Sequence, residues 1–118
     1  MKTVSALLVA GILSAVATTE ASALTGTELQ NRCRDKISSI GELSCTAYLR
    51  GFLDGMVFGT FIGKTDPNLF CTPEGGIAAD QARKIVADYM KAHPEKLHLE
   101  AGALAANAMT AAFPCPLK

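Results

Sequence analysis

The longest helical signal in the chain is the stretch SCTAYLRGFLDGMVFGTFI, which covers residues 44–62. Large apolar residues are frequent along it and are compatible with a helix. They include Cys45, Tyr48, Leu49, Phe52, Leu53, Met56, Val57 and Phe61. Ser44 is a good N-cap, so we predict a helix that begins near Ser44 and ends at about Ile62.

Glycines recur four positions apart along the same stretch, at Gly51, Gly55, Gly59 and Gly63. A glycine in a helix interior costs up to about 1 kcal/mol relative to alanine, so this stripe needs a reason. Residues four apart lie on one face, where the lack of side chains lets another helix approach closely. A membrane span does not fit, because Arg50 and Asp54 interrupt the run. We predict close helix packing, within the fold or across a dimer, and favour packing within the fold.

One more helix is predicted on the N-terminal side of this stretch. Thr25 and Glu28 have the spacing of a capping box, in which each side chain bonds the backbone N–H of the other residue. The apolar stripe that follows consists of Leu29, Cys33 and Ile37. Residues 38–44, which include Gly41, break the pattern and are predicted to separate the two helices.

Two helices are predicted after a loop at residues 64–76, which holds two prolines and a Gly-Gly pair. The first covers about Ala78 to Ala92 and ends at His93-Pro94, because proline disfavours helical backbone in the preceding residue. Its expected buried face is Ile77, Ala82, Ile85, Val86, Tyr89 and Met90. The second covers about Glu100 to Ala112, with Leu104, Ala105, Ala108 and Met109 facing inward. Strand signals are absent from the sequence, which predicts an all-α bundle of about four helices.

The N-terminus has the three-part pattern of a secretory signal. Lys2 gives a positive start, an apolar run follows at residues 4–17, and Ala21 and Ala23 are the small residues that a signal peptidase requires. The apolar run of about 14 residues is shorter than the roughly 20 that a membrane anchor needs. We therefore expect a signal peptide at residues 1–23, cleavage after Ala23, and a single exported domain at residues 24–118 with no further membrane association.

Charge and cysteine content indicate the environment of this domain. Without Lys2 and Glu20, the 11 basic and 11 acidic residues of the chain fall to 10 of each, so the domain has no net charge. We therefore do not expect the domain to bind nucleic acid, which would need a basic surface. Four cysteines remain, at Cys33, Cys45, Cys71 and Cys115. An even count in a small exported domain indicates two disulfides, for which three pairings are possible.

The sequence contains no constellation of residues that is typical of catalysis or metal binding. His93 and His98 are five apart, which does not place them on one helix face, and no close cysteine pair is present for zinc. A histidine at a helix C-terminus is more simply a partner of the helix dipole. No serine has the glycine neighbours of a nucleophile turn, and Gly75-Gly76 lacks the Lys-Ser/Thr of a phosphate loop. We predict a binding protein without catalytic residues, metal or cofactor.

An ordered series of residues narrows the kind of binding protein. The series is Cys45-x-x-Tyr48-x-x-Gly51-x-x-x-Gly55, Phe70-Cys71-x-Pro73, Gln81 with Val86 and Tyr89, His93-Pro94, Ala101 to Ala108, and Phe113-Pro114-Cys115. It resembles the Rap/Tai-type immunity proteins associated with type VI secretion, over nearly all of residues 24–118.

The resemblance implies a small periplasmic helical fold that binds and blocks a peptidoglycan amidase effector, often as a homodimer. It also implies the pairing Cys33–Cys45 and Cys71–Cys115. One departure is Ala78, which stands where the pattern usually has a capping threonine and so loses a cap of about 1 kcal/mol. The matching residues look structural, so the resemblance identifies no residue that contacts the effector.

Two alternative functions are compatible with a small exported helical domain. One is a periplasmic acid-stress chaperone of the HdeA type, which sheds structure at low pH. Such a chaperone is expected to have clustered charges at its ends, whereas residues 24–30 and 114–118 hold only Glu28 and Lys118. The other alternative is a non-enzymatic assembly partner of an envelope complex.

Overall fold

The computed structural model describes residues 22–34 and 40–117. These residues form α1 (Gly26–Arg34), α2 (Ile40–Phe61), α3 (Ala79–Ala92), the 3-10 turn η1 (Pro94–Lys96) and α4 (Ala101–Ala112). The prediction of an all-α fold with four helices is confirmed. The predicted signal peptide lies outside the described residues except for Ser22 and Ala23, and Ile37 of the first predicted stripe lies outside them as well.

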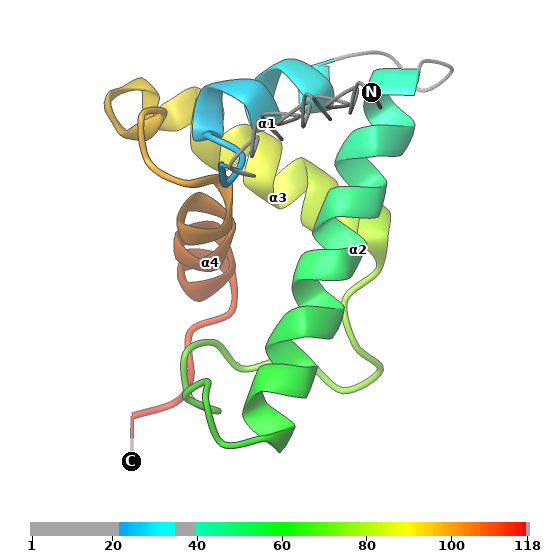
Figure 1. Cartoon of the computed structure of the whole chain (residues 1–118). Coiled ribbons are helices and arrows are strands. Elements are labelled where there is room, and N and C mark those ends of the chain that lie inside the picture. Colours follow the sequence, from blue (N-terminus) through cyan, green and yellow to red (C-terminus); the bar gives the residue numbers. More distant parts are fainter. Residues whose placement is uncertain (1–21, 35–39, 118) are drawn as a thin grey trace, which may run out of the picture.

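Helix α3 packs against each of the other three helices. In Figure 1, α1 crosses one end of the bundle, while α2 and α4 run along opposite sides of it. The fully buried side chains at their junction include Leu29, Leu49, Val86, Met90, Leu104 and Met109. Because each helix contributes to this set, the core depends on all four being in place. The four inward residues predicted for the last helix are all buried.

Helix α2 begins at Ile40, so the predicted start near Ser44 is wrong. Ser44 lies in the second turn, where its hydroxyl accepts a hydrogen bond from the Arg32 guanidinium at 3.3 Å. The earlier start places Glu42 in the first turn, and its carboxylate pairs with Arg83 of α3 at 3.6 Å. A carboxylate at a helix N-terminus is also favoured by the helix dipole. Contact with another helix is thus the physical reason for the longer α2.

The caps of α1 and α3 agree with the sequence. The Thr25 N–H donates to Glu28 Oε2 at 2.8 Å, and the Glu28 N–H donates to Thr25 Oγ1 at 3.3 Å, which confirms the capping box. Ala78 is the N-cap of α3 and makes no side-chain hydrogen bond there. His93 is its C-cap, and its N–H donates to the carbonyls of Tyr89 and Met90.

The capping box makes the stability of α1 depend on pH. Bonds from the Thr25 N–H and hydroxyl lower the pKa of Glu28. A lowered pKa contributes stability above the ordinary glutamate pKa, which is lost as pH falls through the lowered value. We expect wild type to exceed Glu28→Gln in stability at neutral pH and the difference to vanish in acid. Urea unfolding of both proteins across the acid range measures it, and a difference independent of pH would contradict the assignment.

Residues at the start of α1 are joined to the connection between η1 and α4. The Gly26 N–H donates to the Leu99 carbonyl at 2.8 Å, and the Ala101 N–H donates to the Leu24 carbonyl at 2.7 Å. A Cβ at Gly26 would lie 2.9 Å from the Leu97 carbonyl oxygen and would overlap Leu104. Only glycine therefore allows the two segments to come this close. We call these hydrogen-bonded segments, residues 24–27 and 97–101, the terminal clasp.

Two disulfides hold the bundle together, with the pairing that the resemblance implies. Cys33–Cys45 links α1 to α2, and both residues are buried. Cys71–Cys115 links the loop after α2 to the chain after α4, and both residues are partly exposed. No helix in the described part of the chain is long and apolar enough to cross a membrane.

Candidate interaction surface

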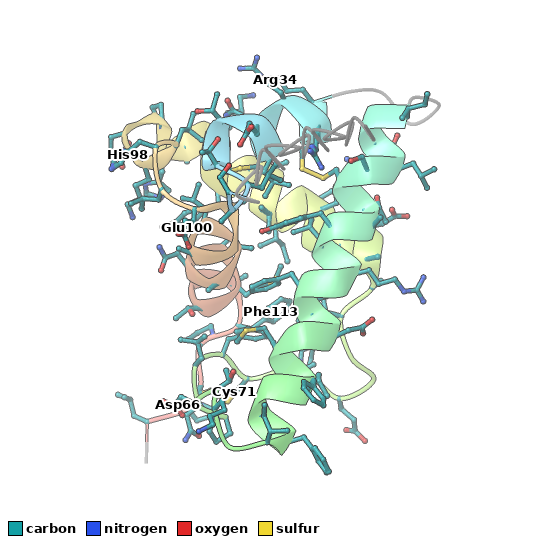
Figure 2. All side chains as sticks on the ribbon, viewed as in Figure 1. Arg34, Asp66, Cys71, His98, Glu100 and Phe113 are labelled. Carbon is teal, nitrogen blue, oxygen red and sulfur yellow. A yellow bond between two sulfur atoms is a disulfide. The ribbon has the colours of Figure 1, made fainter. Side chains whose placement is uncertain are left out.

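The side of α2 that faces away from the bundle is largely apolar. Five large apolar side chains on it are well exposed: Ile40 (88%), Leu43 (71%), Val57 (72%), Phe58 (62%) and Phe61 (86%). Figure 2 shows side chains that project outward along α2, away from α1, α3 and α4. Exposed apolar side chains gathered on one side of a helix are typical of a site of interaction with another macromolecule. We call this side of α2 the outer face.

Both sides of α2 are apolar, and the tertiary structure covers only one of them. Cys45 and Leu49 are fully buried against the other helices. Val57 and Phe61 belong to the same apolar run of the sequence as these buried residues, yet both are exposed. Apolar residues surround the helix, so periodicity alone does not distinguish the covered side from the outer face.

The four glycines spaced along α2 and just after it, Gly51, Gly55, Gly59 and Gly63, do not act as one packing stripe. A Cβ added at Gly51 or Gly55 would meet nothing within 4 Å among the described residues, so packing within this part of the fold is wrong for these two. Gly59 is buried, because a Cβ there would overlap the side chain of Thr65. Gly63 has a φ of 70° and ends the helix, since the following Lys64 N–H donates to the Gly59 carbonyl at 2.9 Å.

A groove of about 530 Å³ lies between the C-terminal half of α2 and the loop that follows it. Its apolar walls include Leu53, Val57, Phe70 and Ile77, and its acidic residues are Asp54 and Asp66. Cys71 also lines it, so the Cys71–Cys115 disulfide ties one wall to the chain after α4. Figure 2 shows Asp66, Cys71 and Phe113 gathered at this end of the molecule. The Cys71 N–H bonds the Phe113 carbonyl at 2.9 Å and strengthens the same link.

His93 and His98 lie at the opposite end, where His93 caps α3 and His98 is exposed. His93 Nδ1 lies 3.1 Å from Glu95 Oε1, and its ring lies 4.3 Å from that of Tyr89. A hydrogen bond from its own backbone N–H, followed by the His93 contact, lowers the pKa of Glu95. Lys96 donates to the Tyr89 hydroxyl at 2.9 Å, which raises the pKa of Lys96. Among residues 22–34 and 40–117, no three His, Cys, Asp or Glu side chains are grouped to hold a metal ion.

The model of the Rap1a immunity proteins matches residues 25–115. This chain belongs to the Rap1a immunity protein family. The match begins at the capping box of α1 and ends at the second cysteine of the Cys71–Cys115 disulfide, so it includes every described helix. No curated protein and no solved structure matches the chain.

Membership of the Rap1a family defines the general activity. Rap1a immunity proteins are non-enzymatic and neutralise a cognate effector of type VI secretion by binding it. In this Rap1a protein most of the exposed large apolar residues lie on the outer face and beside the groove, both of which involve α2. Sequence reasoning identified α2 but missed the exposure of its outer face, the role of Gly26 and the Glu42–Arg83 pair. A carboxylate near the start of a long apolar helix was the available signal for that pair.

Proposed function

We propose that this Rap1a protein is exported to the periplasm and neutralises a peptidoglycan amidase effector there, as a homodimer. A toxin that cuts peptidoglycan acts outside the inner membrane, so its inhibitor has to act in the same compartment. The inhibitor must also persist there, which the two disulfides favour. Disulfides form and persist in oxidising compartments such as the periplasm, and no described cysteine is left as a free thiol.

Signal cleavage after Ala23 is part of the proposal, and the terminal clasp supports it. Leu24 is partly buried and packs against the core, and its carbonyl accepts the hydrogen bond from Ala101. Ser22 and Ala23 are exposed. Cleavage after Ala23 would therefore release the segment before the fold and leave every residue of the clasp in the mature domain at residues 24–118.

The observation that carries the neutralising function is the family match together with a surface suited to a protein partner. The groove combines apolar walls with two carboxylates, and the disulfide at Cys71 gives it a rigid wall. Preformed apolar surface with a few polar groups is what protein interfaces place at their centres. A rigid inhibitor also loses little conformational entropy when it binds, which favours a long-lived complex.

The proposal is tested with purified type VI amidase effectors and protein prepared from the periplasm. We expect hydrolysis of peptidoglycan peptides to fall to background when one equivalent of the protein is added per effector. In cells that receive the effector in the periplasm, we expect the full chain to protect. A chain without residues 1–23 should fail to protect cells because it is not exported, and this variant is the matched control for location.

Other outcomes separate the alternatives. Protection of many unrelated proteins from aggregation, seen only after acid treatment and without inhibition of any amidase, would replace the proposal with the chaperone function. Stable binding to a single non-enzymatic envelope protein would replace it with a role in assembly. Inhibition of a type VI effector that cuts another bond would keep the immunity function and contradict the amidase target.

A further inference from the structure

The outer face of α2 has a pattern that is symmetric about the middle of the helix. Its central stripe consists of Ile40, Leu43, Ala47, Gly51, Asp54, Phe58 and Phe61, spaced three and four positions apart. About the midpoint between residues 50 and 51, Ile40 corresponds to Phe61, Leu43 to Phe58, and Ala47 to Asp54. The face therefore has large apolar side chains at both ends and small residues near its centre.

We infer that this face binds a second copy of the chain, with the two α2 helices antiparallel and crossing near Gly51. A two-fold axis brings the same surface of both copies together, so each residue meets its counterpart from the other half of the pattern. Leu43 of each copy then packs on the partner's Phe58, and Ile40 on the partner's Phe61. An unrelated partner would not require such symmetry. The inference rests on the homodimer in the proposed function and assigns its contact surface.

The charged residues of this face are also complementary in the same arrangement. Asp54 lies within the stripe and Arg50 lies beside it, one turn away. Neither residue takes part in an ion pair among the described residues of the protomer. In the antiparallel arrangement Asp54 lies opposite the partner's Ala47, one turn from the partner's Arg50. The two-fold axis produces this Asp–Arg contact twice, which neutralises the carboxylate inside an otherwise apolar interface.

The glycine and the size of the face fit the same partner. Gly51 has open space where a side chain would be, so the backbone of another helix can approach closely at that point. Five large apolar side chains on each copy expose on the order of 100 Å² each. Two such faces would bury about 1,000 Å² in total, which reaches the lower limit of specific protein interfaces.

Gly51→Leu tests the inference by sedimentation velocity of the protein purified from the periplasm. A Cβ added at Gly51 meets no described residue of the protomer, so the variant should keep its helix content and fold. We expect wild type to be a dimer and Gly51→Leu to raise the dimer dissociation constant by about 10- to 100-fold, as overpacking of a close contact does. Ala103→Leu adds the same side chain at an exposed position of α4 and should leave the dimer intact.

Charge exchange and cross-linking test the orientation. Arg50→Asp should weaken the dimer, and adding Asp54→Arg to it should restore the dimer. Gly51→Cys should form a disulfide between copies, whereas Leu43→Cys should not, because its own counterpart lies about 22 Å away along the antiparallel partner. Cross-linking of both would contradict the antiparallel orientation.

The dimer and the neutralising activity are distinguished by separate readouts. A wild-type protein that stays monomeric at every concentration would overturn the inference, even if it inhibits the amidase. A dimer that Gly51→Leu leaves unchanged would also overturn it, because the contact would then lie elsewhere. A wild-type dimer that responds as expected but inhibits no effector would keep the contact surface and contradict the proposed function.

Discussion

Replacing Cys71 and Cys115 together by alanine is expected to lower the free energy of unfolding by about 4 kcal/mol. The disulfide joins residues 44 positions apart, so its loss allows the unfolded chain many more conformations. Both cysteines are partly exposed, and the change therefore leaves the buried core nearly intact. We expect the variant to remain helical but to unfold at much lower urea concentration, with the groove losing its fixed wall.

The matched comparison is the double replacement of Cys33 and Cys45. This disulfide spans 12 positions, for which loop closure contributes about 3 kcal/mol. Its sulfur atoms lie in the core, so their removal adds a packing loss. Urea unfolding under oxidising conditions measures both variants, with the slope against urea rising as each constraint is lost. A loss below about 1 kcal/mol for the Cys71 and Cys115 variant would contradict stabilisation through the unfolded chain.

Gly26→Ala is expected to destabilise the protein by about 1–3 kcal/mol, although it adds a single methyl group. The new carbon would lie 2.9 Å from the Leu97 carbonyl oxygen, which is backbone and cannot rotate away. The terminal clasp has to open to admit it. Loss of the hydrogen bonds from Gly26 to Leu99 and from Ala101 to Leu24 would then expose the start of both α1 and α4.

Gly102→Ala is the control for this prediction, and its expected effect has the opposite sign. Gly102 lies in the first turn of α4, where the one described atom near an added Cβ is the Tyr48 hydroxyl oxygen at an ordinary 3.7 Å. Alanine should therefore stabilise α4 by up to about 1 kcal/mol through its helix propensity. Thermal unfolding of both variants measures the contrast. Equal effects of the two substitutions would show that the close approach at Gly26 does not limit the fold.

Much of the fold could be predicted from local signals in the sequence. The capping box at Thr25 and Glu28 and the stop at His93-Pro94 involve residues within four positions of each other, so neighbouring side chains and backbone determine them. The inward residues of α4 follow from helix periodicity. Leu104 and Met109 are the large apolar residues of an otherwise alanine-rich helix, so the side that carries them is the one expected to be buried. The start of α2 could not be predicted in this way, since Glu42 is held by Arg83 from another helix.

The candidate surface was harder to predict, and the glycines of α2 show why. The equal spacing of four glycines suggested one function, yet Gly51 and Gly55 have no described neighbour, Gly59 is covered by Thr65 and Gly63 ends the helix. The sequence records only that a side chain is absent. Which residues lie next to each glycine depends on how the loop after α2 folds back against the helix.

By itself the sequence determined the helical class and the approximate positions of the helices, because these follow from spacing along the chain, which is already present before folding. The pairing of the cysteines came only through a family resemblance. Only the tertiary structure decided which side of α2 is covered, why Gly26 must be glycine and where the groove lies. An apolar residue favours burial wherever it occurs, and only the placement of α1, α3 and the loop after α2 decides which apolar residues remain for a partner.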